Sequence, residues 1–345
     1  SNPKIEQFWL SYIDALIEEK QFDTAIEIFE QGKKQELKGE KVDALEKQLT
    51  LITQVVEPAL PEQNKSLTLS EKRKKTAEQK NKKAKKQNSK GITPSQEQLS
   101  SLLEYYQNGR YGDAEKLAVY ITQKFPKHQF GWKVLGAALK QTGRVSESLV
   151  PSQKAATLSS QDAEAHYNLG NTFKELGRLD EAEASYTQAI ALNPDYATAH
   201  YNLALTLKEL GGLDEAEVNL RQAIALKPDY AEAHNNLGAT LKQLGRLNEA
   251  EASYKQAIAL EPDYAEAHSN LGVTLKELGR LDEAEASYTQ AIALKPDFAE
   301  AHSNLGNTLQ ELGRLDEAET SYKQAIALKP DYAEAHSNLG NTLKE

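Results

Sequence analysis

A unit of 34 residues is repeated almost without change over the second half of the chain. Its copies begin at Ala163, Ala197, Ala231, Ala265 and Ala299, and a sixth begins at Ala333. A fixed period of this length predicts a solenoid, in which each unit packs only on its neighbours and cannot bury its apolar face alone. Such a chain forms an array of like units. We expect its function to lie on its surface, because each copy presents the same outward residues at a regular spacing along the array.

Each unit predicts two antiparallel helices joined by a short turn. Counting Ala163 as position 1, the residues His166, Leu169 and Phe173 form a stripe at helical spacing. Gly177 suits the left-handed residue just beyond a helix end. A second stripe includes Tyr186, and a proline at position 32 ends that helix.

This pattern resembles the tetratricopeptide repeat family, which has a large residue, Leu-Gly, a bulky residue, a small Ala, an aromatic residue, a second Ala and a Pro. In the first copy these are His166, Leu169, Gly170, Phe173, Ala182, Tyr186, Ala189 and Pro194. The resemblance implies an all-α fold, a right-handed α-solenoid (superhelix) of antiparallel helix pairs. Histidine stands where the family usually has tryptophan, and both side chains can pack there.

The pattern weakens toward the N-terminus. The predicted order is an N-terminal helical segment with one degenerate unit (1–56), a basic polar linker (57–92), two degenerate units (93–162), five near-consensus units (163–332) and the first helix of a truncated further repeat (333–345). The N-terminal unit is suggested by the spacing of Trp9, Ala25 and Phe29. Pro151 is predicted to shorten or kink the helix that contains it.

Composition narrows the function classes. The chain of 345 residues has a formal charge of −10, yet residues 71–90 hold ten Lys or Arg against two Glu, which leaves the rest strongly acidic. Because the chain is acidic outside this one tract, we predict no specific nucleic-acid partner. The basic tract itself is either a solubilising spacer or a tether for acidic partners. No apolar run is long enough to span a membrane. The lack of cysteine excludes disulfides and thiol catalysis.

Histidine occupies position 4 in every copy. The residues are His166, His200, His234, His268, His302 and His336. Equivalent positions in adjacent units should lie about 10 Å apart, whereas a metal needs nitrogen ligands at about 2 Å. We therefore interpret them as packing residues and predict no metal and no cofactor. No copy holds a nucleophile with a base or a glycine-rich phosphate loop, so the chain is predicted not to be an enzyme.

Asparagine occupies position 6 in every copy. The residues are Asn168, Asn202, Asn236, Asn270, Asn304 and Asn338. The position lies off the apolar stripe, and asparagine costs roughly 0.5–0.7 kcal/mol there relative to alanine. Its amide both donates and accepts, so it can pair with the backbone of a ligand. The residue at position 5 differs among the copies, which is consistent with a groove position that contacts a ligand.

This asparagine ladder, with the phrase SNLGNTLKE, resembles the superhelical repeat region of O-linked N-acetylglucosamine transferases. The resemblance implies that the ladder lines a concave groove and grips an extended protein segment by its main chain. No part of the chain resembles the glycosyltransferase domain. The predicted site is completed by asparagines at position 9 and lysines at position 12, namely Asn171, Asn307, Lys174, Lys208, Lys242 and Lys276. Glutamate at position 2 of most copies argues against a clamp for a C-terminal carboxylate.

Three functions remain open at this stage. The first is a protein–protein interaction scaffold that binds an extended peptide segment in the groove. The second is a structural protein that forms homo-oligomers end to end through uncapped solenoid ends. The third is the substrate-recruiting arm of a larger transferase whose catalytic domain is absent from this sequence.

Overall fold

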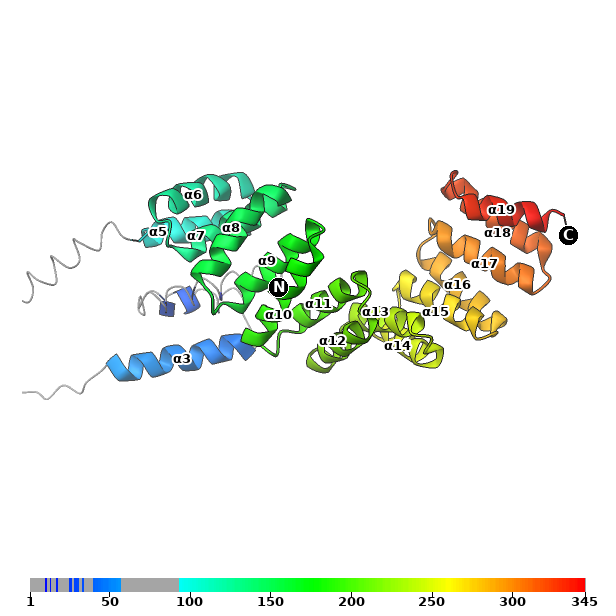
Figure 1. Cartoon of the computed structure of the whole chain (residues 1–345), viewed down its shortest axis with the longest axis horizontal. Helices are drawn as coiled ribbons and strands as arrows, with labels where there is room; N and C mark the ends of the chain where they lie inside the picture. Colours follow the sequence, from blue (N-terminus) through cyan, green and yellow to red (C-terminus); the bar gives the residue numbers. More distant parts are fainter. Residues whose placement is uncertain are drawn as a thin grey trace, which may run out of the picture. The chain divides into compact units, whose positions relative to one another are not determined.

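The computed structural model describes residues 93–344, a helix at 40–56 and single residues between 10 and 33, and the regular structure in these parts is helical (Figure 1). The chain divides into two compact units, Ser1–Thr172 and Phe173–Glu345. The linker predicted at 57–92 lies outside the described residues, and so does Trp9.

In the N-terminal unit, consecutive helices from α5 to α8 pack against one another. The helices are α3 (Glu40–Val56), α5 (Gln96–Gln107), α6 (Tyr111–Lys124), α7 (Gln129–Gln141), α8 (Val145–Leu158) and the first part of α9 (Ala163–Glu175). Leu102, Ile121 and Phe130 are fully buried in the core of this unit. Ala25 and Phe29 are buried in the same core.

In the C-terminal unit, consecutive helices from α10 to α19 pack against one another. The helices are α10 (Leu179–Leu192), α11 (Ala197–Glu209), α12 (Leu213–Leu226), α13 (Ala231–Gln243), α14 (Leu247–Leu260), α15 (Ala265–Glu277), α16 (Leu281–Leu294), α17 (Ala299–Glu311), α18 (Leu315–Leu328) and α19 (Ala333–Thr342). The predicted α-solenoid of helix pairs is confirmed.

Each first helix in the array ends at a glycine in the left-handed region. Gly279 has a φ of 75°, which costs glycine nothing because it has no Cβ. Its N–H donates to the carbonyl of Lys276 (2.9 Å), and the N–H of Arg280 donates to that of Leu275 (2.9 Å). This pair of bonds satisfies the last carbonyls of α15 and turns the chain into α16.

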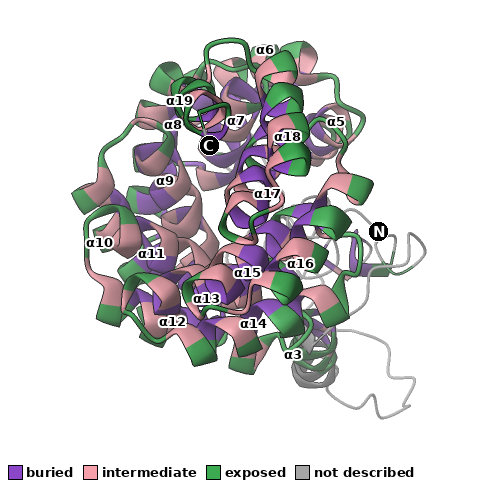
Figure 2. Cartoon of the chain, turned by 90° about the vertical axis from the view of Figure 1, so that its right-hand side faces the viewer, coloured by how far each residue is buried: buried purple, intermediate pink, exposed green. Residues whose placement is uncertain are grey.

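A second glycine allows the two helices of a unit to approach closely. A Cβ added to Gly272 on α15 would lie 2.7 Å from the ring of Tyr288 on α16. Tyr288 is 1% exposed and fills the space between the helices. The same pair occurs as Gly238 with Tyr254 and as Gly306 with Tyr322. Figure 2 shows the resulting buried residues between the paired helices.

Pro151 was predicted to shorten or kink its helix; the shortening is wrong, and the kink stays a prediction. Helix α8 has 14 residues with Pro151 inside it, the same length as α10. Proline removes one backbone hydrogen bond from a helix interior. Here the ring is buried and lies close to Gly136 of α7. Packing against α7 offsets the missing bond.

Candidate peptide-binding face

The first helices of successive repeats in the C-terminal unit form one surface. Each of α11, α13, α15, α17 and α19 contacts the next in this series. In Figure 2, α11, α13 and α15 lie on the inner side of the array, and α12, α14 and α16 lie on its outer side. We call the surface of these five helices the first-helix face.

The position-6 asparagines of the C-terminal unit lie on this face. All five of these residues are half-buried, namely Asn202, Asn236, Asn270, Asn304 and Asn338. They stand beside the apolar stripe because position 6 is turned away from position 4 on a helix of 3.6 residues per turn. Asn168 and Asn171 lie on α9, in the part of that helix that belongs to the N-terminal unit.

The asparagine amides partly link neighbouring repeats. The Nδ2 of Asn236 donates to the hydroxyl of Tyr201 in the preceding repeat (3.0 Å) and to the carbonyl of Glu232 (2.9 Å). The Nδ2 of Asn270 donates to the Oδ1 of Asn235 (3.1 Å). The bonds to Tyr201 and to Asn235 each join two consecutive first helices, whereas the bond to Glu232 lies within α13. The ladder therefore has a structural role that the repeat pattern alone did not reveal.

The last repeats show the same arrangement. The Nδ2 of Asn338 donates to the Oδ1 of Asn307 (2.8 Å), which also accepts from the hydroxyl of Tyr322 (2.7 Å). Asn307, predicted as a ligand contact, is thus already hydrogen-bonded to α18 and α19. Among the described residues, no donor reaches the Oδ1 atoms of Asn236, Asn270, Asn304 and Asn338. These oxygens are the unused acceptors of the face.

Position 5 is a packing position rather than a groove position. The ring of Tyr201 lies 4.8 Å from that of Tyr230, centroid to centroid. Asn235, Ser269 and Ser303 at the same position are buried. Burial raises the pKa of Tyr201 to about 12, so its hydroxyl stays protonated while it accepts from the next repeat. The variation of position 5 among the copies therefore reflects contacts between repeats.

A threonine at position 10 supports each asparagine and was missed by the sequence analysis. Its hydroxyl donates to the backbone carbonyl of the position-6 residue, as Thr240 does to Asn236 (2.9 Å) and Thr274 does to Asn270 (3.0 Å). Both threonines are fully buried. Such a bond satisfies a hydroxyl inside a helix. The presence of threonine at position 10 of every copy is the sequence signal that could have predicted this contact.

The position-12 lysines form ion pairs across the face. Each bonds to the position-13 glutamate of the following repeat: Lys174 to Glu209 (3.5 Å), Lys242 to Glu277 (3.0 Å) and Lys276 to Glu311 (2.9 Å). The fourth predicted lysine, Lys208, is half-buried and has Gln243 at the corresponding place. Most of the positive charge predicted to meet a ligand is therefore neutralised within the array.

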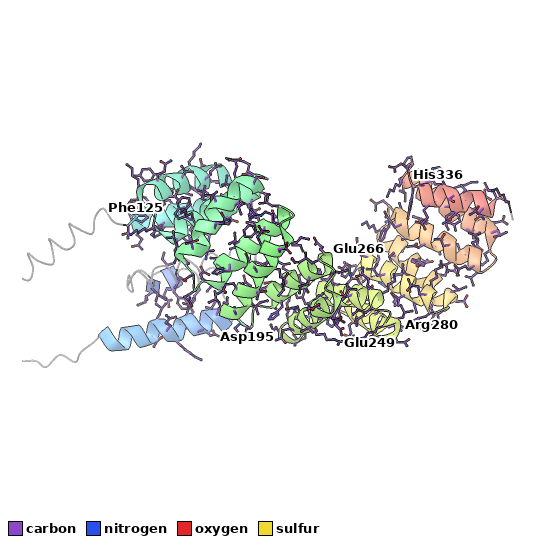
Figure 3. The ribbon with its side chains drawn as sticks, in the orientation of Figure 1. Phe125, Asp195, Glu249, Glu266, Arg280 and His336 are labelled. Carbon is purple, nitrogen blue, oxygen red and sulfur yellow. The ribbon has the colours of Figure 1, made fainter. Side chains whose placement is uncertain are left out.

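The glutamates at position 2 are also partly neutralised. Glu266 pairs with Lys295 (3.0 Å), and Glu300 pairs with Lys329 (3.7 Å). The hydrogen bond from Lys295 lowers the pKa of Glu266. Figure 3 labels Glu266 at the start of α15 and Arg280 in the turn after it, at opposite ends of that helix. Part of the charge along the face is thus paired within the array.

Five of the six histidines at position 4 act as hydrogen-bond donors, whereas the buried Nε2 of His166 has no partner among the described residues. In the five donors, the Nε2 atom bonds to the carbonyl of the proline six residues earlier, at distances of 3.1 Å in His200, 3.2 Å in His234, 3.0 Å in His268, 3.1 Å in His302 and 2.9 Å in His336. A carbonyl only accepts, so Nε2 bears the proton. Of these five, only His200 is buried, so the stripe is less enclosed than predicted. The described residues hold no cluster of three possible metal ligands.

An open cleft of about 500 Å³ lies on the N-terminal unit, over α5 and α6. It is lined by Tyr105, Leu117 and Tyr120, with Arg110 and Asp113 at its side. These two charges pair with each other at 2.7 Å. No sequence motif marked this cleft, and its Arg110 and Asp113 side chains are already paired with each other.

Comparison with known proteins supports the fold. Residues 129–341 match the family model described as the cilia and flagella-associated protein 70 C-terminal domain. No curated protein matches the sequence. None of the helices in the described part is both long and apolar enough to cross a bilayer.

Three solved structures are similar in fold. The Cut9–Hcn1 hetero-tetramer of APC/C is 20% identical with a TM-score of 0.56, over 70% of this chain and 48% of that one. Pseudomonas aeruginosa pilF is 20% identical with a TM-score of 0.55, over 62% of this chain and 97% of its own. A tetratricopeptide repeat protein from Parabacteroides merdae is 17% identical with a TM-score of 0.54, over 72% and 98%.

The chain spans about half the length of the Cut9 structure it matches. At these identities the structural similarity establishes the fold alone. Tetratricopeptide relatives are typically non-catalytic scaffolds, so the fold supports a general role in protein–protein interaction, with protein or peptide partners. The match over residues 129–341 means that the chain belongs to the cilia and flagella-associated protein 70 C-terminal domain family of tetratricopeptide repeats.

Proposed function

We propose that the protein binds an extended peptide segment along the first-helix face, through the position-6 asparagines. The observation that carries this proposal is the set of unused Oδ1 acceptors at the same position of consecutive repeats. An amide oxygen without a donor can accept from the backbone N–H of a ligand. Asparagine is unfavourable in a helix interior, and a hydrogen bond to a ligand offsets this cost.

The spacing fits an extended chain. Packed helices lie 8–10 Å apart, and an extended chain rises about 3.3–3.6 Å per residue. One asparagine therefore meets the ligand at about every third residue. The five asparagines of the first-helix face correspond to a segment of about 12 residues.

Recognition on this face depends mainly on the ligand backbone. The repeats are nearly identical, so they offer few means of distinguishing one ligand side chain from the next. The paired charges at positions 2, 12 and 13 favour a peptide that is neutral or of mixed charge. Since Nδ2 of Asn236 and Asn270 already donates to the neighbouring repeat, the ligand supplies the N–H group in this interaction.

The test begins with a phage-displayed library of random 15-residue peptides selected on the full chain. Enriched peptides are synthesised with a fluorescent label, and their Kd values are measured by anisotropy. The triple variant Asn236→Ala, Asn270→Ala, Asn304→Ala is expected to bind at least tenfold more weakly, a loss of about 1.4 kcal/mol. N-methylation of the peptide bonds that meet the ladder should produce a similar loss, because it removes the donor.

The chain offers a matched control on its second helices. Gln256, Gln290 and Gln324 are exposed side-chain amides in the same three consecutive helix pairs, one on each of the second helices α14, α16 and α18, away from the first-helix face. The triple change of these residues to alanine should leave affinity unchanged. Circular dichroism must show that both variants remain folded. Equal affinity of the asparagine variant and wild type, or the absence of any enriched peptide, would refute the proposed function.

A further inference from the structure

The ion pairs between position 12 and position 13 form a regular series with one interruption. Lys174, Lys242 and Lys276 each have a glutamate of the next repeat within 3.5 Å. Lys208 occupies the same position on α11, but the next repeat supplies Gln243. We call this place the open rung.

Lys208 has no other carboxylate at hand. Its sequence neighbour Glu209 pairs with Lys174, and adjacent helix residues do not face each other. Glu277, two repeats further along, pairs with Lys242. Among the described residues, therefore, no ion pair involves Lys208.

The open rung leaves a half-buried ammonium without a counter-charge. Burial lowers the pKa of Lys208, and no nearby carboxylate opposes this effect. A partly desolvated charge without a partner is unfavourable. An anionic group that approaches from solvent would relieve this cost, whereas at Lys242 and Lys276 it would meet a glutamate that is already paired.

From this geometry we infer that Lys208 receives the carboxylate of an aspartate or glutamate side chain of the bound peptide. The inference rests on the proposed peptide-binding function and adds to it the register of the peptide along the first-helix face. Lys208 lies six residues after Asn202 on the same helix, about 9 Å along its axis. The other position-12 ammonium without an ion pair among the described residues, Lys344, is exposed and lies beyond the end of α19, so the half-buried Lys208 fixes which ligand residue lies against α11.

Peptides enriched on the full chain provide the probe. We expect an acidic residue at one fixed position of these peptides. For such a peptide, Lys208→Gln should weaken binding about tenfold, because it removes the cation. Gln243→Glu should weaken binding to a similar extent, because it supplies the missing glutamate and closes the open rung within the protein.

Two controls separate this effect from general charge and from folding. Gln256→Glu makes the same substitution at an exposed residue of α14 and should leave affinity unchanged. A peptide with the acidic residue replaced by glutamine should bind wild type, Lys208→Gln and Gln243→Glu equally. Thermal melts of the variants should stay near that of wild type.

The outcomes distinguish the two proposals. If peptides are enriched and depend on the asparagines but show no fixed acidic position, the role of Lys208 is overturned and the peptide-binding function stands. The same conclusion follows if Gln243→Glu binds the acidic peptide as tightly as wild type. If no peptide is enriched, both proposals fail together.

Discussion

The degenerate repeat at 129–162 and the near-identical repeats of the C-terminal unit make the same contact with different residues. In the former, the indole Nε1 of Trp132 donates to the carbonyl of Pro126 (2.9 Å). In the latter, the imidazole Nε2 of His268 donates to the carbonyl of Pro262 (3.0 Å). Position 4 therefore requires a large side chain with one N–H donor at its end, and both tryptophan and histidine satisfy this requirement.

The junctions between repeats differ more deeply. In the C-terminal unit, positions 5 and 34 bring together the rings of Tyr201 and Tyr230. In the N-terminal unit the same positions hold Lys133 and Asp162, which pair at 2.8 Å with Glu164 also within 3.1 Å of the ammonium. A buried ion pair has replaced an aromatic contact. Helix packing within a repeat is preserved, while the contact between repeats has changed its chemistry.

The largest loss of stability is expected at the ion pair of Lys133 with Asp162 and Glu164. Lys133 is 8% exposed, and Lys133→Met leaves Asp162 and Glu164 without their cation. Breaking a buried pair in this way costs about 3 kcal/mol. Urea denaturation followed by the fluorescence of Trp132 would report the change in the N-terminal unit. Lys116→Met, at an exposed residue, should cost less than about 0.5 kcal/mol, and equal midpoints for the two variants would contradict the prediction.

The same variant has a defined pH dependence. Burial alone would raise the pKa of Asp162, but the charge and hydrogen bond of Lys133 and two backbone N–H groups outweigh it and lower the pKa. The stabilisation is therefore present above the unfolded pKa of about 3.9 and is lost as the pH falls through the lower folded value. In the variant the unpaired carboxylate of Asp162 takes up protons more readily, because the cation that lowers its pKa is gone. The stability gap between wild type and variant should narrow as the pH is lowered from 7 toward 4.

An intermediate effect is expected at position 8. Gly272→Ala places a methyl group 2.7 Å from the buried ring of Tyr288 and should cost about 2 kcal/mol by overpacking. Gly136→Ala in the N-terminal unit meets the hydroxyl of Ser152 at 2.9 Å, a smaller group that can rotate, so the cost should be lower. Urea denaturation followed by circular dichroism measures both.

Gly340→Ala is the control for this pair, because no atom lies within 4 Å of the added Cβ. Alanine favours a helix over glycine by roughly 0.5–1 kcal/mol, so this variant should be at least as stable as wild type. If Gly272→Ala and Gly340→Ala behaved alike, the close approach to Tyr288 would not be what position 8 requires.

The sequence predicted the contacts within a repeat much better than those between repeats. The stripe and the turn glycine follow from helical periodicity, so the paired helices could be predicted from one copy. The bond from Asn236 to Tyr201 joins residues 35 apart, and the pair of Arg280 with Glu251 joins residues 29 apart. Such offsets depend on how one repeat stacks on the next, which periodicity along a single helix does not encode. Pairs of glutamate with an arginine of the next repeat, such as Glu217 with Arg246 and Glu285 with Arg314, were not predicted for the same reason.

The smallest effect is expected at position 4, where Trp132 and His268 make the same contact in different repeats. His268→Phe keeps an aromatic ring at position 4 but removes the donor to the carbonyl of Pro262. A typical hydrogen bond contributes about 1 kcal/mol, and because His268 is only half-buried, water can partly replace it. His268→Trp restores an N–H donor on a large ring, as Trp132 shows in the other unit. The free energy of unfolding, measured in urea, should fall for the phenylalanine variant and stay near wild type for the tryptophan variant. If both variants lost the same stability, ring shape rather than the hydrogen bond would define position 4.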